Sequence, residues 1–244
     1  MEQETQRGAS KSRRAETILV VAAHPDDEVL GCGGTMARHA EAGDDVHLLI
    51  LGEGVTARDI RRDVAGRQRD LQRLNRAVET AADLLGVVKV HRASFPDNRF
   101  DSVDLLDVIK AVEQVFELVK PQRVYTHHAG DLNVDHRITH QAVVTAARPV
   151  PGGDVASVLA FEVPSSTDWQ GAGSHVPFVP QVYVEITHTL KRKLKALAVY
   201  RSEMRPFPHA RSLRALEALA RVRGATVGVQ AAEAFVLVRD VVHE

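Results

Sequence analysis

Thr17–Thr35 reads TILVVAAHPDDEVLGCGGT, and the fold expected for this 244-residue chain follows from it. Its apolar run, Ile18–Ala23, predicts a strand that is buried on both faces of a sheet. An imidazole and three carboxylates follow within His24–Glu28, and a glycine-rich step then leads into a helical pattern. In an open α/β sheet, ligands bind just beyond the carboxyl ends of the strands. The sequence therefore predicts a functional site at the end of this first strand.

The rest of the chain alternates between short apolar runs and segments with apolar residues at helical spacing. Such alternation is typical of a mostly parallel sheet flanked by helices, that is, an α/β fold. No repeat or domain linker interrupts it, so we expect a disordered tail over 1–15 and a single domain over 16–244. We expect further strands over 46–51, 87–91, 123–126, 155–163, 182–186 and 233–238, helices over 34–42, 67–85, 103–119, 135–147, 189–201 and 211–222, and a long loop over 52–65.

Composition narrows the range of partners. The formal net charge is −1, which leaves no electrostatic case for nucleic acid or for an anionic membrane. No apolar run approaches the roughly 20 residues that a membrane-spanning helix needs. Cys32 is the single cysteine, so neither an intrachain disulfide nor a cysteine-based metal site can form. These features are compatible with a reducing compartment, and we expect a cytoplasmic protein.

His24 and Asp27 are spaced so that a turn entering a helix brings both to one point. Crowded carboxylates repel one another and are costly to desolvate, a conflict that a divalent cation removes. An imidazole nitrogen with a carboxylate oxygen suits Zn²⁺, and Asp26 would remain beside the metal as a base for bound water. The alternative is a charged turn at a helix N-terminus, where acidic residues are favourable without any metal.

A second loop with histidine and aspartate follows a predicted strand about a hundred residues later, at His127–Arg137. His136 from this loop completes a set of two histidines and one carboxylate. Three protein ligands leave a position open for water, as catalytic zinc requires. Zinc would acidify that water and polarise a carbonyl oxygen, which is what amide hydrolysis needs.

These motifs resemble those of the PIG-L/LmbE-like family of zinc-dependent N-acetylglucosaminyl deacetylases. The resemblance implies a Rossmann-like sheet with a divergent, less regular C-terminal part. It runs from about Thr17 to the C-terminus and is strongest over the first 150 residues. It is carried by AHPDDEVLGCGGT at Ala23–Thr35, GDLNVDHR at Gly130–Arg137, FPDNRFD at Phe95–Asp101 and AEAF near Ala232.

The resemblance also implies roles for single residues. His24, Asp27 and His136 match the family's metal ligands, for one Zn²⁺ or another divalent metal per chain, and Asp26 matches its general base. Substrates of the family are small molecules with an N-acetylated glucosamine unit, carried on an inositol, a malate, a lipid or an antibiotic scaffold. Their hydrolysis releases acetate and a free amine. Members often assemble, so a homo-oligomer is possible.

Asn133 stands where many members have a histidine thought to protonate or stabilise the transition state. An amide can donate a hydrogen bond but cannot shuttle a proton. His127 and His128 are the natural substitutes, and strand alternation should turn only one of them toward the site. We take His128 as the candidate acid, with Asp135 orienting it. The alternatives are that Asp26 serves as both base and acid, or that both histidines are ordinary polar residues.

Asp97, Asn98 and Arg99 follow the third predicted strand at the same sheet edge. They are candidate substrate-binding residues, because asparagine and aspartate are suited to sugar hydroxyls. They are equally ordinary turn formers.

Three competing interpretations remain. Two histidines and a carboxylate also form the facial triad of non-heme Fe(II) enzymes, although Asp26 would have no task there. A nucleotide-binding module fits poorly, because Gly31–Gly34 does not match the dinucleotide motif and acidic residues precede it. A non-catalytic or differently specific metal-binding protein of the same fold is the third.

Overall fold

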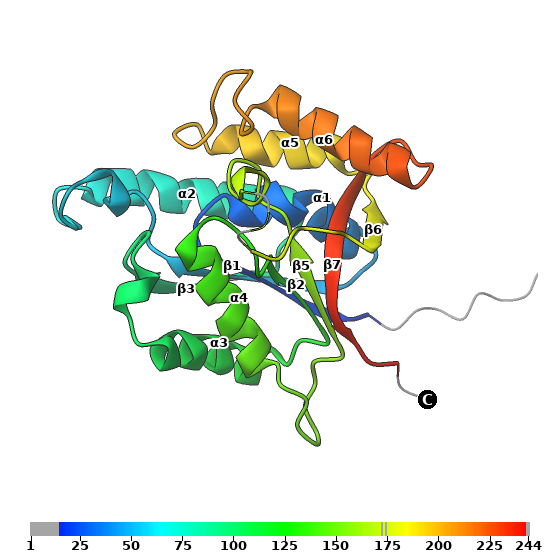
Figure 1. The fold of residues 1–244 in the computed structure, drawn as a ribbon, viewed down its shortest axis with the longest axis horizontal. Coiled ribbons are helices and arrows are strands. Elements are labelled where there is room, and N and C mark those ends of the chain that lie inside the picture. The colour runs from blue at the N-terminus through cyan, green and yellow to red at the C-terminus, as the bar shows by residue number, and fades with distance from the viewer. Residues whose placement is uncertain (1–14, 172, 174, 243–244) are drawn as a thin grey trace, which may run out of the picture.

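The computed structural model describes residues 15–171, 173 and 175–242, so nearly all of the predicted tail, 1–14, lies outside the described residues. A seven-stranded sheet in the order β3-β2-β1-β4-β5-β7-β6 forms its centre (Figure 1). The first five strands of that order are parallel, and β7 runs antiparallel to both of its neighbours. The strands are β1 Thr17–Ala22, β2 Asp45–Gly52, β3 Lys89–Phe95, β4 Arg123–His127, β5 Ser157–Phe161, β6 Val182–Glu185 and β7 Ala232–Asp240.

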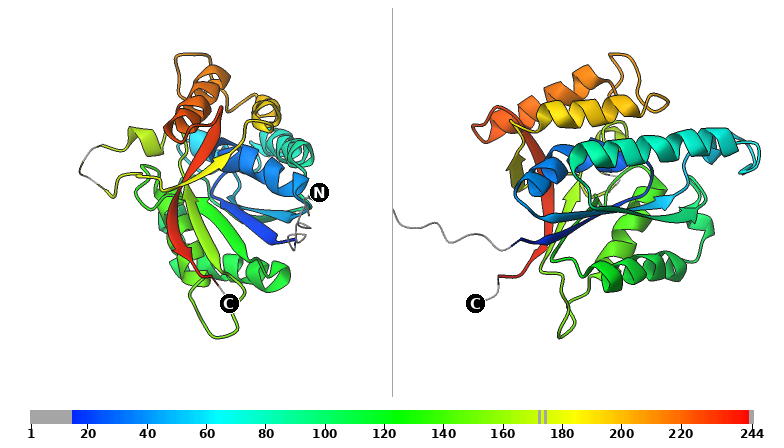
Figure 2. Two further views of the ribbon diagram at one scale, coloured as in Figure 1. Left: turned by 90° about the vertical axis from the view of Figure 1, so that its right-hand side faces the viewer. Right: turned by 180° about the vertical axis from the view of Figure 1, so that it is seen from behind.

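Helices cover both faces of the sheet, which confirms the predicted α/β class. One face carries α3 and α4, and the other carries α1 and α2, with α5 and α6 on the outer side of that layer (Figure 2). Among the described helices, none is both long enough and apolar enough to cross a membrane. The helices are α1 Asp27–Glu41, α2 Gln68–Leu85, α3 Leu105–Val119, α4 Val134–Ala146, α5 Leu190–Val199 and α6 Leu213–Thr226, with 3₁₀ turns η1 Thr56–Arg58, η2 Phe100–Ser102 and η3 Thr167–Trp169.

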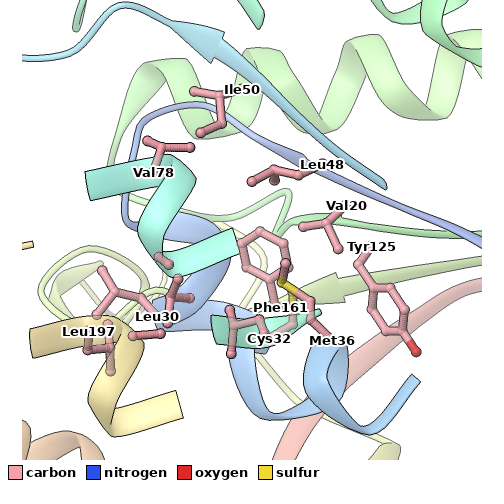
Figure 3. Close-up of a cluster of buried hydrophobic side chains, with 14 of the residues drawn as sticks. Val20, Leu30, Cys32, Met36, Leu48, Ile50, Val78, Tyr125, Phe161 and Leu197 are labelled. Atoms are coloured by element: carbon pink, nitrogen blue, oxygen red, sulfur yellow. The ribbon is translucent and has the colours of Figure 1, made fainter. Parts of the chain in front are cut away.

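The apolar core has two large clusters, one on each face of the sheet, and a small third cluster of Ile186, Leu190, Ala220 and Ala231 beside α5 and α6. The larger cluster joins the sheet to α1, α2 and α5 (Figure 3). Phe161 lies near its middle and is fully buried, as are Val78 of α2 and Leu197 of α5. The strands at the centre of the sheet are buried on both sides, as their continuous apolar runs predict.

β1 lies between β2 and β4, and this is where the order of the strands reverses. The chain proceeds from β1 to β2 and β3 in one direction and from β4 to β5 in the other. Ile18 of β1 pairs with Arg123 of β4, so the loops that follow these two strands leave the sheet side by side. A crevice at such a switch point is where open α/β sheets bind ligands.

The structure corrects the predicted start of the first helix. We expected a glycine-rich turn and then a helix over 34–42, but α1 begins at Asp27 and contains all three glycines. The break in the glycine-rich step is a kink at Cys32 inside the helix, and the glycines allow close packing around it. A Cβ atom on Gly31 would overlap the ring of Phe161, and one on Gly34 would lie 2.8 Å from Ile186.

A kink in α1 explains the AEAF motif near the C-terminus. Cys32 has non-helical dihedral angles (φ −144°, ψ 23°), which frees backbone N–H groups in the next turn. Glu233 in β7 accepts hydrogen bonds from the backbone nitrogens of Gly34 (2.9 Å) and Thr35 (2.7 Å), and it also pairs with Lys193 (2.6 Å). This buried carboxylate caps the second half of α1, so the end of the chain holds the helix that carries the first site motif.

Candidate metal centre and active site

His24, Asp27 and His136 lie together at the carboxyl ends of β1 and β4. The turn after β1 supplies His24 and Asp27, and the first turn of α4 supplies His136. Asp27 Oδ2 lies 3.2 Å from His24 Nδ1 and 3.2 Å from His136 Nε2. One ligand atom from each residue lies within 4.8 Å of the others. The predicted three-ligand set therefore converges on one point, and Asp27 and His136 are buried.

The chemistry of this cluster fits a divalent cation. Asp27 Oδ1 and His136 Nε2 are buried without a hydrogen-bond partner among the described residues. Burial disfavours the charged imidazole, but hydrogen bonds to Asp135 and Asp27 prevail and raise the pKa of His24 to about 10. Burial is likewise outweighed by Asp27 and Asp131, which raise the pKa of His136 to about 9. The carboxylates thus make a positive charge favourable at the cluster. Two imidazoles and a carboxylate are ligands that suit Zn²⁺.

A carboxylate lies behind each of the two histidines. Asp135 Oδ2 is 3.0 Å from His24 Nε2, and Asp131 Oδ1 is 3.1 Å from His136 Nδ1. In both cases the other imidazole nitrogen faces Asp27, which is the side on which a metal would be held. Partners of this kind fix the tautomer and orientation of metal-binding histidines.

Sequence reasoning missed Asp131, although it lies in the same GDLNVDHR motif. Its carboxylate accepts hydrogen bonds from the hydroxyls of Ser166 and Thr167 and is fully buried. Burial opposes its ionisation, but the contact with His136 and these hydroxyls hold the pKa of Asp131 below its usual value. A buried, ionised carboxylate is thus aimed at the back of His136.

We expect Asp131→Asn to weaken metal binding by roughly 10–100-fold, the usual effect of losing such a partner. The amide no longer carries the charge that orients and polarises the imidazole. Competition with a chromogenic chelator measures the affinity. Asp154→Asn, in the exposed loop before β5, is the matched control. Equal affinity in the two variants contradicts the assigned role.

The predicted pairing of Asp135 with His128 is wrong. Both oxygens of Asp135 have other partners: Oδ1 accepts the backbone N–H of Phe100 (2.9 Å), and Oδ2 meets His24. Asp135 lies in the first turn of α4, which turns its side chain toward the end of β1. His128 leaves the end of β4 in another direction.

Of the two histidines that end β4, His127 is the one that faces the cluster. Its ring stacks on His136 with a centroid distance of 4.0 Å, and its Nε2 accepts the backbone N–H of Ala23 (2.8 Å). Burial and the neighbouring His136 hold the pKa of His127 well below its usual value. His128 Nε2 instead donates to the carbonyl oxygen of Val176 (2.9 Å). Alternation along the strand does separate the two side chains, but in the opposite sense to our expectation.

Asp26 lies beside the cluster in a left-handed backbone conformation (φ 103°) and is 1% exposed. Its backbone N–H donates to Glu28 Oε2 (3.0 Å), and Glu28 in turn accepts the hydroxyl of Tyr200. Its carboxylate pairs with Arg211, whose Nη1 is 3.0 Å from Oδ2. Burial raises the pKa of Asp26 well above its usual value, although Arg211 opposes the shift. A carboxyl group tuned upward in this way has the character of a general base.

Asn133 caps α4. Its side-chain oxygen accepts the backbone N–H of Asp135 (2.8 Å), and its Nδ2 donates to Asn98 Oδ1 (2.8 Å). The amide group of Asn133 thus bonds the helix backbone and a neighbouring loop. This role is structural and involves no proton transfer.

The three candidate substrate-binding residues after β3 each contact a different part of the protein. Asp97 Oδ1 lies 3.4 Å from His24 Nε2, so this residue is brought to the cluster. Asn98 has a positive φ of 52° and bridges Asp97 to Asn133. Arg99 donates to the carbonyl oxygen of Ile60 (3.3 Å) and so holds the long loop after β2. Contact of these residues with a substrate stays a prediction.

A groove of about 340 Å³ is lined by His128, Thr167, Phe178 and other described residues, and none of His24, Asp27 and His136 is among them. Thr167 links the groove to the back of His136, since its hydroxyl donates to Asp131. The larger cavity, about 440 Å³, lies elsewhere, between α3, α4 and the end of β7.

Comparisons with known proteins agree with this geometry. The family model described as PIG-L, GlcNAc-PI de-N-acetylase, matches residues 19–147. The "Uncharacterized deacetylase YaiS" of Escherichia coli is 29% identical over 199 residues, 79% of this chain and 95% of that protein. The diacetylchitobiose deacetylase of Thermococcus kodakarensis is 27% identical over 199 residues, 76% of this chain and 69% of that protein.

Among solved structures, GalB, the 4-carboxy-2-hydroxymuconate hydratase of Pseudomonas putida, superposes with a TM-score of 0.73 at 22% identity. The match covers 94% of this chain and 98% of GalB. At that identity the likeness shows the fold alone.

Proposed function

The chain belongs to the PIG-L family, and from this premise we propose that it is a metal-dependent N-deacetylase of N-acetylglucosamine-type substrates. The reaction releases acetate and a free amine. The observation that carries the proposal is the buried carboxylate of Asp26 next to the converging side chains of His24, Asp27 and His136. The sequence likeness to a diacetylchitobiose deacetylase supports the class of substrate.

His24, Asp27 and His136 would hold the metal, and the donor set favours one Zn²⁺ per chain, with other divalent metals possible. When bound, the ion supplies Lewis-acid chemistry that acidifies water and polarises the acetamide carbonyl. Asp135 and Asp131 keep the two imidazoles in the required orientation.

Asp26 takes the proton of the attacking water and later returns it to the leaving amine. Two contacts favour Asp26 in both roles. The Nε2 proton of His128 is donated to a backbone carbonyl, and Asp135 does not face that ring. Asn133 has no proton to give. A buried carboxyl group with a raised pKa is able to accept a proton and to release it again within one cycle.

The substrate is a small N-acetylated sugar or glycoconjugate that would enter along the groove lined by His128 and Phe178. Asp97, Asn98 and Arg99 would contact it from the loop after β3. An Fe(II) oxygenase of the same ligand set would have no use for the buried base Asp26. A hydratase reaction, the activity named for GalB, would release no amine.

Incubation of the zinc-loaded protein with N-acetylglucosamine, N,N′-diacetylchitobiose and an N-acetylglucosaminyl inositol tests the proposal. We expect equal amounts of free amine and acetate from at least one substrate, and loss of both after chelation, with recovery on adding zinc. Fluorescamine and an acetate assay measure the products. If the metal-loaded protein releases no amine from any N-acetylated sugar, the proposed function is wrong.

A further inference from the structure

Asp26 receives its side-chain contact from a distant part of the chain. Arg211 lies in the loop between α5 and α6, and its Nη1 donates to Asp26 Oδ2 at 3.0 Å. Among the described residues, the hydrogen bond to this carboxylate goes to Oδ2, and Oδ1 is not one of the fully buried oxygens that lack a partner. One carboxylate oxygen is therefore held, and the other is left for a proton.

Arg211 is itself fixed in place at several points. Its Nε donates to Ser165 Oγ (2.7 Å), and its backbone N–H donates to His209 Nδ1 (3.0 Å). Its carbonyl oxygen accepts the backbone N–H of Arg205 (3.3 Å). The side chain is 23% exposed, so it lies at the edge of the site with part of its guanidinium toward solvent. A planar guanidinium anchored at Nε presents Nη1 in a defined direction.

The backbone and the side chain of Asp26 are held separately. Glu28 accepts the backbone N–H of Asp26 and supports its left-handed conformation. Arg211 acts on the carboxylate alone. Loss of the guanidinium should thus change the direction of the carboxylate without unfolding the turn that presents the metal ligands.

We propose that Arg211 is a positioning residue, which holds Asp26 Oδ2 and thereby leaves Oδ1 as the atom that accepts the proton of water. The inference rests on the proposed function. A charge-assisted hydrogen bond of this kind is short, directional and stronger than a neutral one. Misplacement of a reacting group by about 1 Å can cost about 10²-fold in rate.

Arg211→Ala should lower kcat by about 10²-fold while KM and bound zinc stay near those of the parent. Guanidinium chloride at low millimolar concentration should restore part of kcat in this variant, and sodium chloride should not. Arg211→Lys should recover only part, since an ammonium lacks the second anchoring donor. The control is Arg214→Ala, which removes a guanidinium that stacks over Phe207 at 4.4 Å. That control should show neither loss nor rescue.

Non-additivity supplies the decisive measurement. If Arg211 acts through Asp26, then Asp26→Asn/Arg211→Ala should be no slower than Asp26→Asn. Urea unfolding of the parent, Asp26→Asn, Arg211→Ala and the double variant gives the coupling free energy between the two residues. This measurement needs no substrate. Parental kcat in Arg211→Ala at equal zinc, or a coupling of zero in unfolding, overturns the proposal. If the parent releases no amine but the four proteins show a strong coupling in unfolding, the proposed function is wrong. The contact between Arg211 and Asp26 would still be supported.

Discussion

Asp26→Asn should lower turnover of the zinc-loaded protein by about 10²-fold or more and leave the bound metal unchanged. The amide keeps the size of the carboxylate and can still lie against Arg211, but it cannot accept the proton of water. Asp26 is not one of the three converging ligand residues, so the substitution should not lower the affinity for the metal. Steady-state amine release and metal analysis of the same sample measure the two quantities.

His128→Ala is the comparison variant for this experiment. If Asp26 is both base and acid, His128→Ala keeps turnover within a few-fold of the parent, because the Nε2 proton of His128 is donated to the carbonyl oxygen of Val176. A large loss in His128→Ala, with metal retained, assigns the acid role to the histidine. Near-normal turnover in Asp26→Asn would show that another group is the base.

His136→Ala should release most of the bound metal and with it the activity. The variant removes one of three ligands and leaves Asp27 Oδ2 with His24 at 3.2 Å and His127, which is not one of the three converging residues, at 3.6 Å. We expect a fall in affinity beyond the roughly 10–100-fold that follows loss of an outer partner such as Asp131. Metal analysis after gel filtration measures the content, and circular dichroism checks the fold.

The matched control is His140→Ala, one turn further along α4. His140 bonds the carbonyl oxygen of His127 (2.8 Å) and is not one of the three converging residues. Its variant should keep its metal. Unchanged metal stoichiometry in His136→Ala would contradict the assignment of His136 as a ligand.

Local chemistry was enough to predict the architecture. Continuous apolar runs such as Ile18–Ala23 are typical of strands buried on both faces, and the structure places β1 at the centre of the sheet. The convergence of His24, Asp27 and His136 was also predictable, because parallel strands bring their carboxyl ends to one edge.

Local signals failed where a residue's task lies in contact with a distant segment. The glycines of α1 predicted a turn, but they allow Phe161 and Ile186 to approach the helix. Glu233 caps that helix from the other end of the chain.

The partners of the site residues depend on directions that no spacing in the chain defines. Asp135 meets His24 rather than His128, because the first turn of α4 faces β1. Arg211 reaches Asp26 across 185 positions and belongs to no motif. Periodicity and motif spacing depend on neighbours in the chain, so they identify elements and the residues at their ends. Which side chain meets which across the site depends on how α4 and the loop between α5 and α6 pack against β1, and only folding sets that.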